Sequence, residues 1–147
     1  MPSLSISSPV GKLAIHEKDA AIIAIRWADE CESNGSPLLA EAARQLEAYF
    51  AGRLTQFDLP LRPAGSNFER RVWSAMQEIP YGETACYGDL ATKIDSGPRA
   101  VGGACGKNPI PIVIPCHRVL ARSGLGGYSG EGGLKTKQAL LTLEGAL

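Results

Sequence analysis

The chain has 147 residues, of which 44% are hydrophobic and 20% are charged. These values are typical of one or two small folded domains, and they exclude wholesale disorder, a collagen and a coiled coil. Fifteen Lys and Arg residues balance fifteen Asp and Glu residues. The overall charge therefore neither indicates nor excludes nucleic acid, although a slight basic excess after residue 65 places any DNA-binding surface in the second half.

Three short segments of the first half have the composition of β-strands. They are residues 4–7, 12–16 and 21–27. Turn residues separate them, which predicts a three-strand meander. A helical pattern of apolar residues then begins at Ser36-Pro37 and continues to Phe50, with Gly52 just past its end. We therefore predict a first domain of strands and a helix over residues 1–62.

A linker rich in proline and glycine, residues 59–66, leads into a mainly helical second domain over residues 66–147. Ser66 begins a Ser-x-x-Glu capping box, which predicts the start of a helix. Apolar spacing and flanking turn residues predict helices over residues 68–78, Tyr87–Lys93 and Pro98–Gly106. The last two are joined by the turn 94–97, with Ser96 as the predicted N-cap, and this layout is typical of a helix-turn-helix.

The second helix of this pair contains two adjacent glycines, Gly102 and Gly103. Each costs a helix about 1 kcal/mol relative to alanine. Small side chains allow tight packing against a neighbouring element or close approach to a DNA groove, and the sequence leaves both interpretations open. Arg99, at the head of the same helix, is either a solvated charge or a side chain that probes stacked bases.

Residues 108–119 contain three prolines, which exclude a helix and favour an extended chain. The apolar part, residues 112–114, is predicted to be a buried strand that delivers Cys116 onto a rigid turn beside His117. A thiol becomes a good nucleophile when a nearby base or cation promotes the loss of its proton. Cys116 is therefore either a nucleophile assisted by His117 or a buried structural thiol.

A final helix is predicted over residues 134–144, ending at Gly145. A carboxylate in the last turn of a helix is disfavoured by the helix dipole, which favours an exposed position for Glu144. The alternative is that Glu144 orients His117 and stabilises its charge, as an acid orients the base in a catalytic triad.

The cysteines and histidines show no Cys-x-x-Cys pair. They are Cys31, Cys86, Cys105, Cys116, His16 and His117. We predict no metal site and no cofactor. The longest apolar run, residues 110–114, is far shorter than the ~20 residues of a membrane helix, and no signal peptide is visible. A soluble, cytoplasmic protein with no membrane partner is predicted.

The second half of the sequence resembles the O6-alkylguanine-DNA alkyltransferases, also called methylated-DNA–protein-cysteine methyltransferases. The active-site signature of that family, Pro-Cys-His-Arg-Val in an apolar stretch, stands here at residues 115–119. Further matches, in the same order, are Tyr81-Gly82-Glu83, Tyr87, Arg99-Ala100-Val101-Gly102-Gly103-Ala104, Asn108-Pro109-Ile110-Pro111, Gly127-Tyr128-Ser129-Gly130 and Leu143-Glu144-Gly145. The resemblance implies a two-part α/β fold, in which the first domain has a ribonuclease H-like outline.

The resemblance also implies DNA repair by transfer of the alkyl group from O6-alkylguanine, and from O4-alkylthymine. Cys116 would accept the group irreversibly, so each molecule would act once. His117 would serve as the base through a bridging water and would be held by Glu144. Asn108 would tie the helix-turn-helix to the active-site strand, and Tyr87 would donate a proton to guanine. The residues implied to contact DNA or the flipped base are Arg99, Ala100, Gly102, Gly103, Arg118, Tyr128 and Ser129.

The implied partner is double-stranded DNA that carries an alkylated base, bound by a monomer. The main alternative is a non-catalytic protein that binds alkylated bases and recruits other repair factors. In such relatives the acceptor cysteine is replaced, commonly by tryptophan, whereas this chain has Cys116. A cysteine hydrolase would need an oxyanion site, and a thiol redox protein would need a resolving cysteine, for which the spacing of Cys105 fits no known pattern. The near-zero net charge and the two glycines disfavour a purely transcriptional helix-turn-helix.

Overall fold

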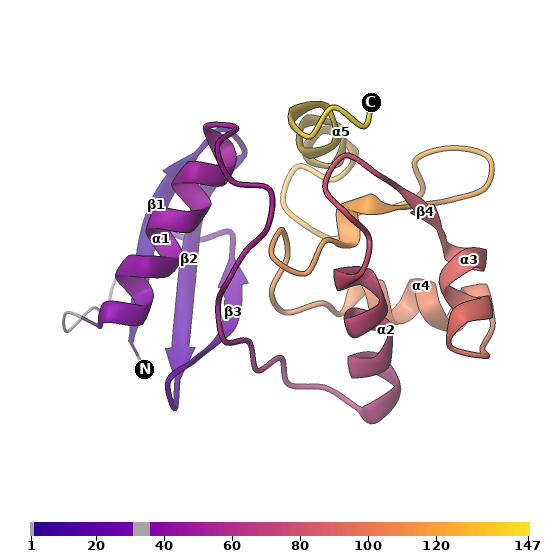
Figure 1. Cartoon of the computed structure of the whole chain (residues 1–147), viewed down its shortest axis with the longest axis horizontal. Coiled ribbons are helices and arrows are strands. Elements are labelled where there is room, and N and C mark those ends of the chain that lie inside the picture. Colours follow the sequence, from indigo (N-terminus) through magenta and orange to yellow (C-terminus); the bar gives the residue numbers. More distant parts are fainter. Residues whose placement is uncertain (1, 31–35) are drawn as a thin grey trace. The chain divides into compact units, whose positions relative to one another are not determined.

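The computed structural model describes residues 2–30 and 36–147. They form two compact units, Met1–Pro63 and Ala64–Leu147 (Figure 1). Cys31, one of the four cysteines of the sequence, lies outside the described residues. Within the described ranges, no helix is both long and apolar enough to cross a membrane.

The first unit is an antiparallel sheet covered by one helix. Its strands, in their order across the sheet, are β1 (Ser3–Ser8), β2 (Gly11–Lys18) and β3 (Ala21–Arg26). Helix α1 (Pro37–Phe50) packs against the sheet and buries Leu39, Leu46 and Tyr49 completely. The helix begins where the Ser36 hydroxyl accepts a hydrogen bond from the backbone N–H of Leu39. The predicted meander and helix are confirmed.

The second unit is mainly helical and includes one short parallel strand pair. Its elements are α2 (Asn67–Gln77), β4 (Ala85–Cys86), α3 (Tyr87–Lys93), α4 (Pro98–Gly106), a 3-10 turn (Cys116–Arg118), β5 (Val119–Leu120) and α5 (Leu134–Leu143). Helix α2 contacts both α3 and α4 and buries Val72, Trp73 and Met76. The indole N–H of Trp73 donates to the carbonyl of Ala104 at 2.8 Å, so α2 holds the helix pair in place. The predicted two-part fold with a helix-turn-helix layout is confirmed.

Two local predictions are wrong. Residues 112–114 form a tight turn instead of a strand, because Ile112 has a φ of +75° and the N–H of Ile114 donates to Ile110 at 2.9 Å. Prolines exclude a helix there but do not distinguish an extended strand from a closed turn. Ser96 is not the N-cap of α4. Because Pro98 is the first helical residue, the N-cap position falls on Gly97.

The predicted capping box is present at the start of α2. The Ser66 hydroxyl accepts from the N–H of Glu69 at 3.1 Å, and the Glu69 carboxylate accepts from the N–H of Ser66 at 2.9 Å. Both bonds satisfy backbone donors that the helix itself leaves without a partner.

We expect Ser66→Ala to lower the free energy of unfolding of the second unit by about 1 kcal/mol, because one of these bonds is lost. Ser96→Ala is the matched control. It removes a hydroxyl outside the cap position and should change the same quantity by less than about 0.5 kcal/mol. Urea denaturation followed by tryptophan fluorescence measures both, and equal losses from the two variants would contradict this assignment.

Candidate active site

The chain between α4 and the 3-10 turn is closed by one side chain, Asn108. Its amide N–H donates to the carbonyl of Ile114 at 2.8 Å, and its amide oxygen accepts from the N–H of Ile110 at 2.9 Å. The two bonds tie together the ends of the 110–114 turn, and Ile110, Ile112 and Ile114 are completely buried. The turn is therefore a rigid support for the residues that follow.

Cys116 begins the 3-10 turn directly after Pro115. Its N–H donates to Ile114 at 2.8 Å, and the N–H of Arg118 donates to Pro115 at 3.0 Å. Cys116 is buried. Burial raises the pKa of its thiol, while a hydrogen bond with the Asn108 side chain and the positive charge of Lys137 lower it. Since burial is the largest of these effects, the thiol holds its proton more tightly than an exposed cysteine does.

The buried ring of His117 is fixed by Glu144. Nε2 of His117 lies 2.7 Å from Oε2 of Glu144, and both side chains are fully shielded from solvent. A carboxylate only accepts hydrogen bonds, so we assign the ring proton to Nε2, which leaves a lone pair on Nδ1. Nδ1 is buried and has no hydrogen-bond partner among the described residues. Burial lowers the pKa of His117 and Glu144 opposes that effect, so the ring rests in the neutral form.

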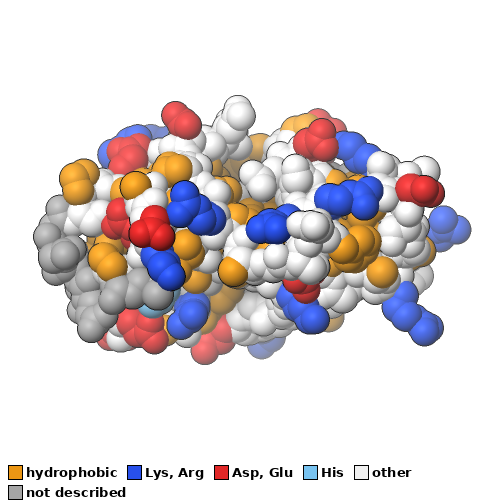
Figure 2. Space-filling view, turned by 90° about the horizontal axis from the view of Figure 1, so that it is seen from below, with side chains coloured by type: hydrophobic (Ala, Val, Ile, Leu, Met, Phe, Trp, Pro, Cys, Tyr) orange, Lys and Arg blue, Asp and Glu red, His pale blue; other side chains and the backbone are white. Residues whose placement is uncertain are grey.

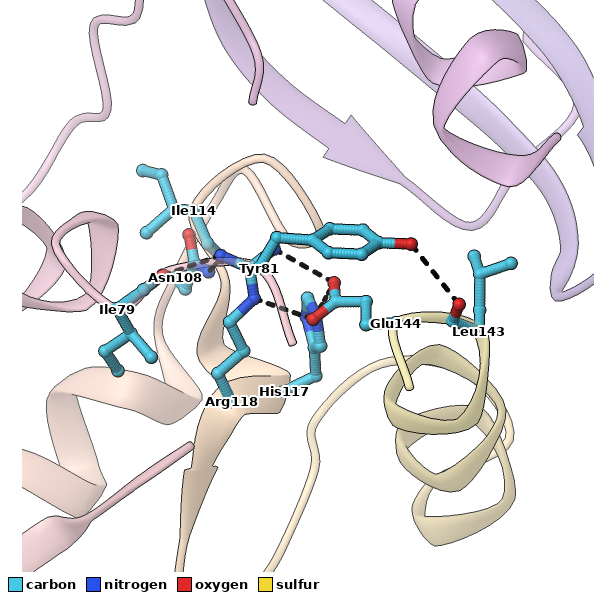
Figure 3. A network of polar contacts seen from close by, with 8 residues as sticks. All are labelled: Ile79, Tyr81, Asn108, Ile114, His117, Arg118, Leu143 and Glu144. Atoms are coloured by element: carbon cyan, nitrogen blue, oxygen red, sulfur yellow. Dashed lines mark hydrogen bonds and ion pairs between the residues drawn. The ribbon is translucent and has the colours of Figure 1, made fainter. Parts of the chain in front are cut away.

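Glu144 is buried at the C-cap of α5, where the dipole argument favoured an exposed surface residue. That expectation is wrong because three donors compensate the carboxylate. They are Nε2 of His117 at 2.7 Å, Nε of Arg118 at 2.8 Å and Nη2 of Arg118 at 3.0 Å (Figure 3). A bidentate arginine pair of this kind outweighs the unfavourable end of a helix dipole.

Arg118 does not lie where contact with DNA requires it. Its guanidinium points into the second unit, where it donates hydrogen bonds to Glu144 and, at 2.7 Å, to the carbonyl of Ile79 (Figure 3). It also lies over the ring of Tyr81. The side chain is 8% exposed. The implied DNA-binding role of Arg118 is therefore corrected to a positioning role, in which it holds the carboxylate that holds His117.

A cavity of about 310 Å³ opens beside the thiol. It is lined by Tyr87, Gly102, Cys105, Gly106, Cys116, Gly127, Tyr128 and Ser129. Burial raises the pKa of both tyrosines, so each phenol keeps its proton at neutral pH. The structure thus gathers Cys116, Tyr87, Gly102, Tyr128 and Ser129, which the sequence places far apart, around one space.

The remaining predicted DNA contacts, Arg99, Ala100 and Gly103, lie on the exposed side of α4 outside the cavity. A Cβ added at Gly102 or Gly103 would meet no atom within 4 Å. Tight internal packing therefore does not explain the two glycines.

On the face seen in Figure 2, basic side chains stand in separate groups among acidic ones.

Lys137, which was not among the residues predicted from the sequence, has its ammonium buried beside the cavity wall. Lys137, Leu140, Leu141 and Glu144 follow the spacing i, i+3, i+4 and i+7, which places them on one face of a helix. That spacing indicates that Lys137 lies on a buried face of the helix, since two of the four residues are leucines.

Two family models together match almost the whole chain. The model described as 6-O-methylguanine DNA methyltransferase, ribonuclease-like domain matches residues 4–63, and that described as 6-O-methylguanine DNA methyltransferase, DNA binding domain matches residues 67–146. A methylated-DNA–protein-cysteine methyltransferase of Mycolicibacterium paratuberculosis is 47% identical over 95% of this chain and 90% of its own length. The crystal structure of Mycobacterium tuberculosis OGT in complex with DNA matches with a TM-score of 0.88 and 43% identity, over 99% of this chain and 94% of that one. The Mycobacterium tuberculosis O6-methylguanine methyltransferase matches with a TM-score of 0.87 and 41% identity, over 99% and 93%.

The depressed pKa of His117 makes stability depend on pH. Below about pH 6.5 the unfolded chain binds a proton at this histidine more readily than the folded chain, so stability falls as the pH falls. The loss reaches up to about 1.4 kcal/mol per pH unit for one histidine. We expect the difference in free energy of unfolding between the parent and His117→Gln to shrink between pH 7 and pH 5. His16, whose pKa is also lowered, is common to both proteins and cancels. A difference that stays constant with pH would show that folding does not change the pKa of His117, and a difference that grows as the pH falls would show that the folded state favours the charged ring.

Proposed function

The chain belongs to the 6-O-methylguanine DNA methyltransferase family, and from this premise we propose that it repairs DNA by moving an alkyl group from O6 of guanine onto Sγ of Cys116. The observation that carries the proposal is the cavity of about 310 Å³ that is lined by both Cys116 and Tyr87. An acceptor and a proton donor on the walls of one cavity are the two groups that such a transfer needs.

His117 serves as the base that removes the proton from the thiol. The need for a base follows from the raised pKa of Cys116, which is buried. The lone pair on Nδ1 of His117 takes the proton through one water, since neighbouring side chains in a 3-10 turn diverge. Glu144, 2.7 Å from Nε2, stabilises the imidazolium that forms, and Arg118 keeps this carboxylate in place.

Tyr87 serves as the acid that assists the departing base. Once the thiolate attacks the alkyl carbon, the S–C bond forms, the C–O bond breaks and the electron pair moves onto the guanine. A proton delivered to guanine N3 neutralises that charge and lowers the barrier. Tyr87 is half-buried in the cavity wall, and burial raises its pKa, so the phenol is protonated when the base arrives. The product is a thioether, which spends the acceptor after one transfer.

The base reaches the cavity by leaving the DNA stack, at a cost of a few kcal/mol. Helix α4 is the element that enters the groove, with Gly102 and Gly103 permitting close approach and Arg99 filling the space that the flipped base leaves. Support comes from the bare face of α4, where a Cβ at either glycine would touch nothing. Tyr128 and Ser129, which also line the cavity, meet the guanine edge. A cavity that admits a purine also admits the smaller O4-alkylthymine, so we extend the proposal to that lesion.

We expect Cys116→Ser to abolish transfer while lesion binding is retained, because the hydroxyl is a far weaker nucleophile and is small enough to fit in place of the thiol. The measurement is intact-protein mass after incubation with a duplex that carries one O6-methylguanine, followed by peptide mapping. The parent should gain one methyl group on the Cys116 peptide and saturate at one per protein. Tight binding with no added mass would instead identify a non-catalytic protein that binds the lesion, and repeated turnover would identify a hydrolase.

We expect Gly103→Ala and Gly103→Leu to raise the stability of the second unit by a similar amount, roughly 0.5–1 kcal/mol, because both residues favour a helix over glycine. Their effects on DNA should differ. Leucine places four carbons on the face of α4 that enters the groove, so its affinity for duplex DNA should fall at least about tenfold, which is about 1.4 kcal/mol, while alanine changes it little. Fluorescence anisotropy at fixed salt measures the affinity. If the leucine variant binds like the parent, this face of α4 does not enter the groove.

A further inference from the structure

Lys137 in α5 is completely buried, and the partners of its ammonium among the described residues are backbone carbonyls. Nζ donates to the carbonyls of Val119 at 2.7 Å, Leu125 at 2.5 Å and Gly127 at 2.9 Å. Burial lowers the pKa of Lys137, but a neutral amine has only two hydrogens, so three acceptors around one nitrogen favour the charged form. The side chain is therefore a buried cation.

The charge of this cation is not neutralised as that of Arg118 is. Arg118 forms an ion pair with Glu144, whereas Lys137 pairs with no carboxylate in the described parts of the chain. A buried charge without a counterion is expensive unless something else compensates it. The nearby group that becomes negative during the proposed reaction is Cys116, and the charge of Lys137 lowers the pKa of that thiol.

The three carbonyls belong to two segments that frame the cavity. Val119 directly follows the turn that holds Cys116, and it pairs with Ala85 in the strand pair β4–β5. Leu125 and Gly127 lead into Tyr128 and Ser129 on the cavity wall. One ammonium thus joins the acceptor segment to the wall that receives the base.

We propose that Lys137 is a positioning residue for alkyl transfer, which fixes residues 125–129 against the acceptor segment and favours the thiolate of Cys116. The inference rests on the proposed function, because it assigns Lys137 to the same site. The ammonium neither gains nor loses a proton in the transfer. It stabilises the negative charge that Sγ carries before attack, and that charge disappears when the S–C bond forms.

The test is the pH dependence of alkylation of Cys116 by iodoacetamide, read by peptide mapping in the parent, Lys137→Met and Lys137→Arg. The other titratable or charged groups around the thiol are His117 with Glu144 and Arg118, Tyr87, Tyr128 and Cys105, and all are unchanged in these variants. Methionine keeps the length of the side chain without the charge, so the pKa of the thiol should rise. Each unit of rise should slow alkylation near neutral pH about threefold, because a tenfold loss of thiolate is partly offset by its greater nucleophilicity. Arginine keeps the charge and should restore the pH profile.

Thr136→Val is the matched control. Thr136 is the preceding residue of α5, is buried, and also holds a loop carbonyl, that of Glu131, but carries no charge. It should leave the pH profile of Cys116 unchanged. A folded Lys137→Met variant with the parent's profile would overturn the proposal and leave Lys137 a purely structural residue. If Lys137→Met does not fold, the Lys137→Arg variant decides. Arginine retains the charge, so a pH profile of Cys116 alkylation that differs from the parent's would also overturn the proposal.

A second readout uses duplex DNA with one O6-methylguanine under single-turnover conditions. Lys137→Met should lower the maximal rate constant at least about threefold. It should leave the half-saturating DNA concentration near that of the parent, because the ammonium is buried. A variant with the parent's maximal rate constant and a raised half-saturating DNA concentration would overturn the proposal. Failure of the parent to accept a methyl group from DNA would refute the proposed function, and the iodoacetamide profile would still decide the role of Lys137.

Discussion

The rest of the second unit depends on the hydrogen bonds that the buried carboxylate of Glu144 accepts. It lies at the end of α5, contacts His117 and Arg118 of the 3-10 turn, and through Arg118 reaches the carbonyl of Ile79 just after α2. Three segments distant in sequence therefore converge on one charge. Removing one partner of such a buried pair leaves the other charge uncompensated. The hydrogen bonds of this network therefore form together and are lost together.

The same network sets the electrostatics around the acceptor thiol. Glu144 and Arg118 cancel each other and His117 rests neutral, so the interior of the site keeps the single positive charge of Lys137. Burial alone would hold the proton on Cys116. A nearby base and a residual positive field act together against burial, one by receiving the proton and the other by stabilising the sulfur anion.

The parts of the fold that could be predicted from sequence are those encoded by short-range patterns. The capping box at Ser66, the meander and the helix pair each depend on residues within a few positions of one another. Residues 112–114 were mispredicted because prolines do not distinguish an extended strand from a turn, which is closed here by a backbone bond and by two bonds of Asn108. Arg118 was mispredicted because its partners lie 26 and 39 residues away. The helical spacing of Lys137 with Leu140 and Leu141 predicts that it is buried, but the sequence does not show its binding partners, because the three carbonyls lie 18, 12 and 10 residues away.

Under the proposed function, a site that acts once has unusual freedom in its construction. A turnover enzyme must regenerate its nucleophile, which requires access for water or a second substrate and a route for the product. Here the alkyl group stays on Cys116 and only the repaired base must leave. The thiol can therefore be placed in a turn closed by Asn108 and backed by fully buried isoleucines, with flexibility required only of the DNA. Rigid placement of the thiol favours attack geometry, because little orientational freedom is left to lose on reaching the transition state.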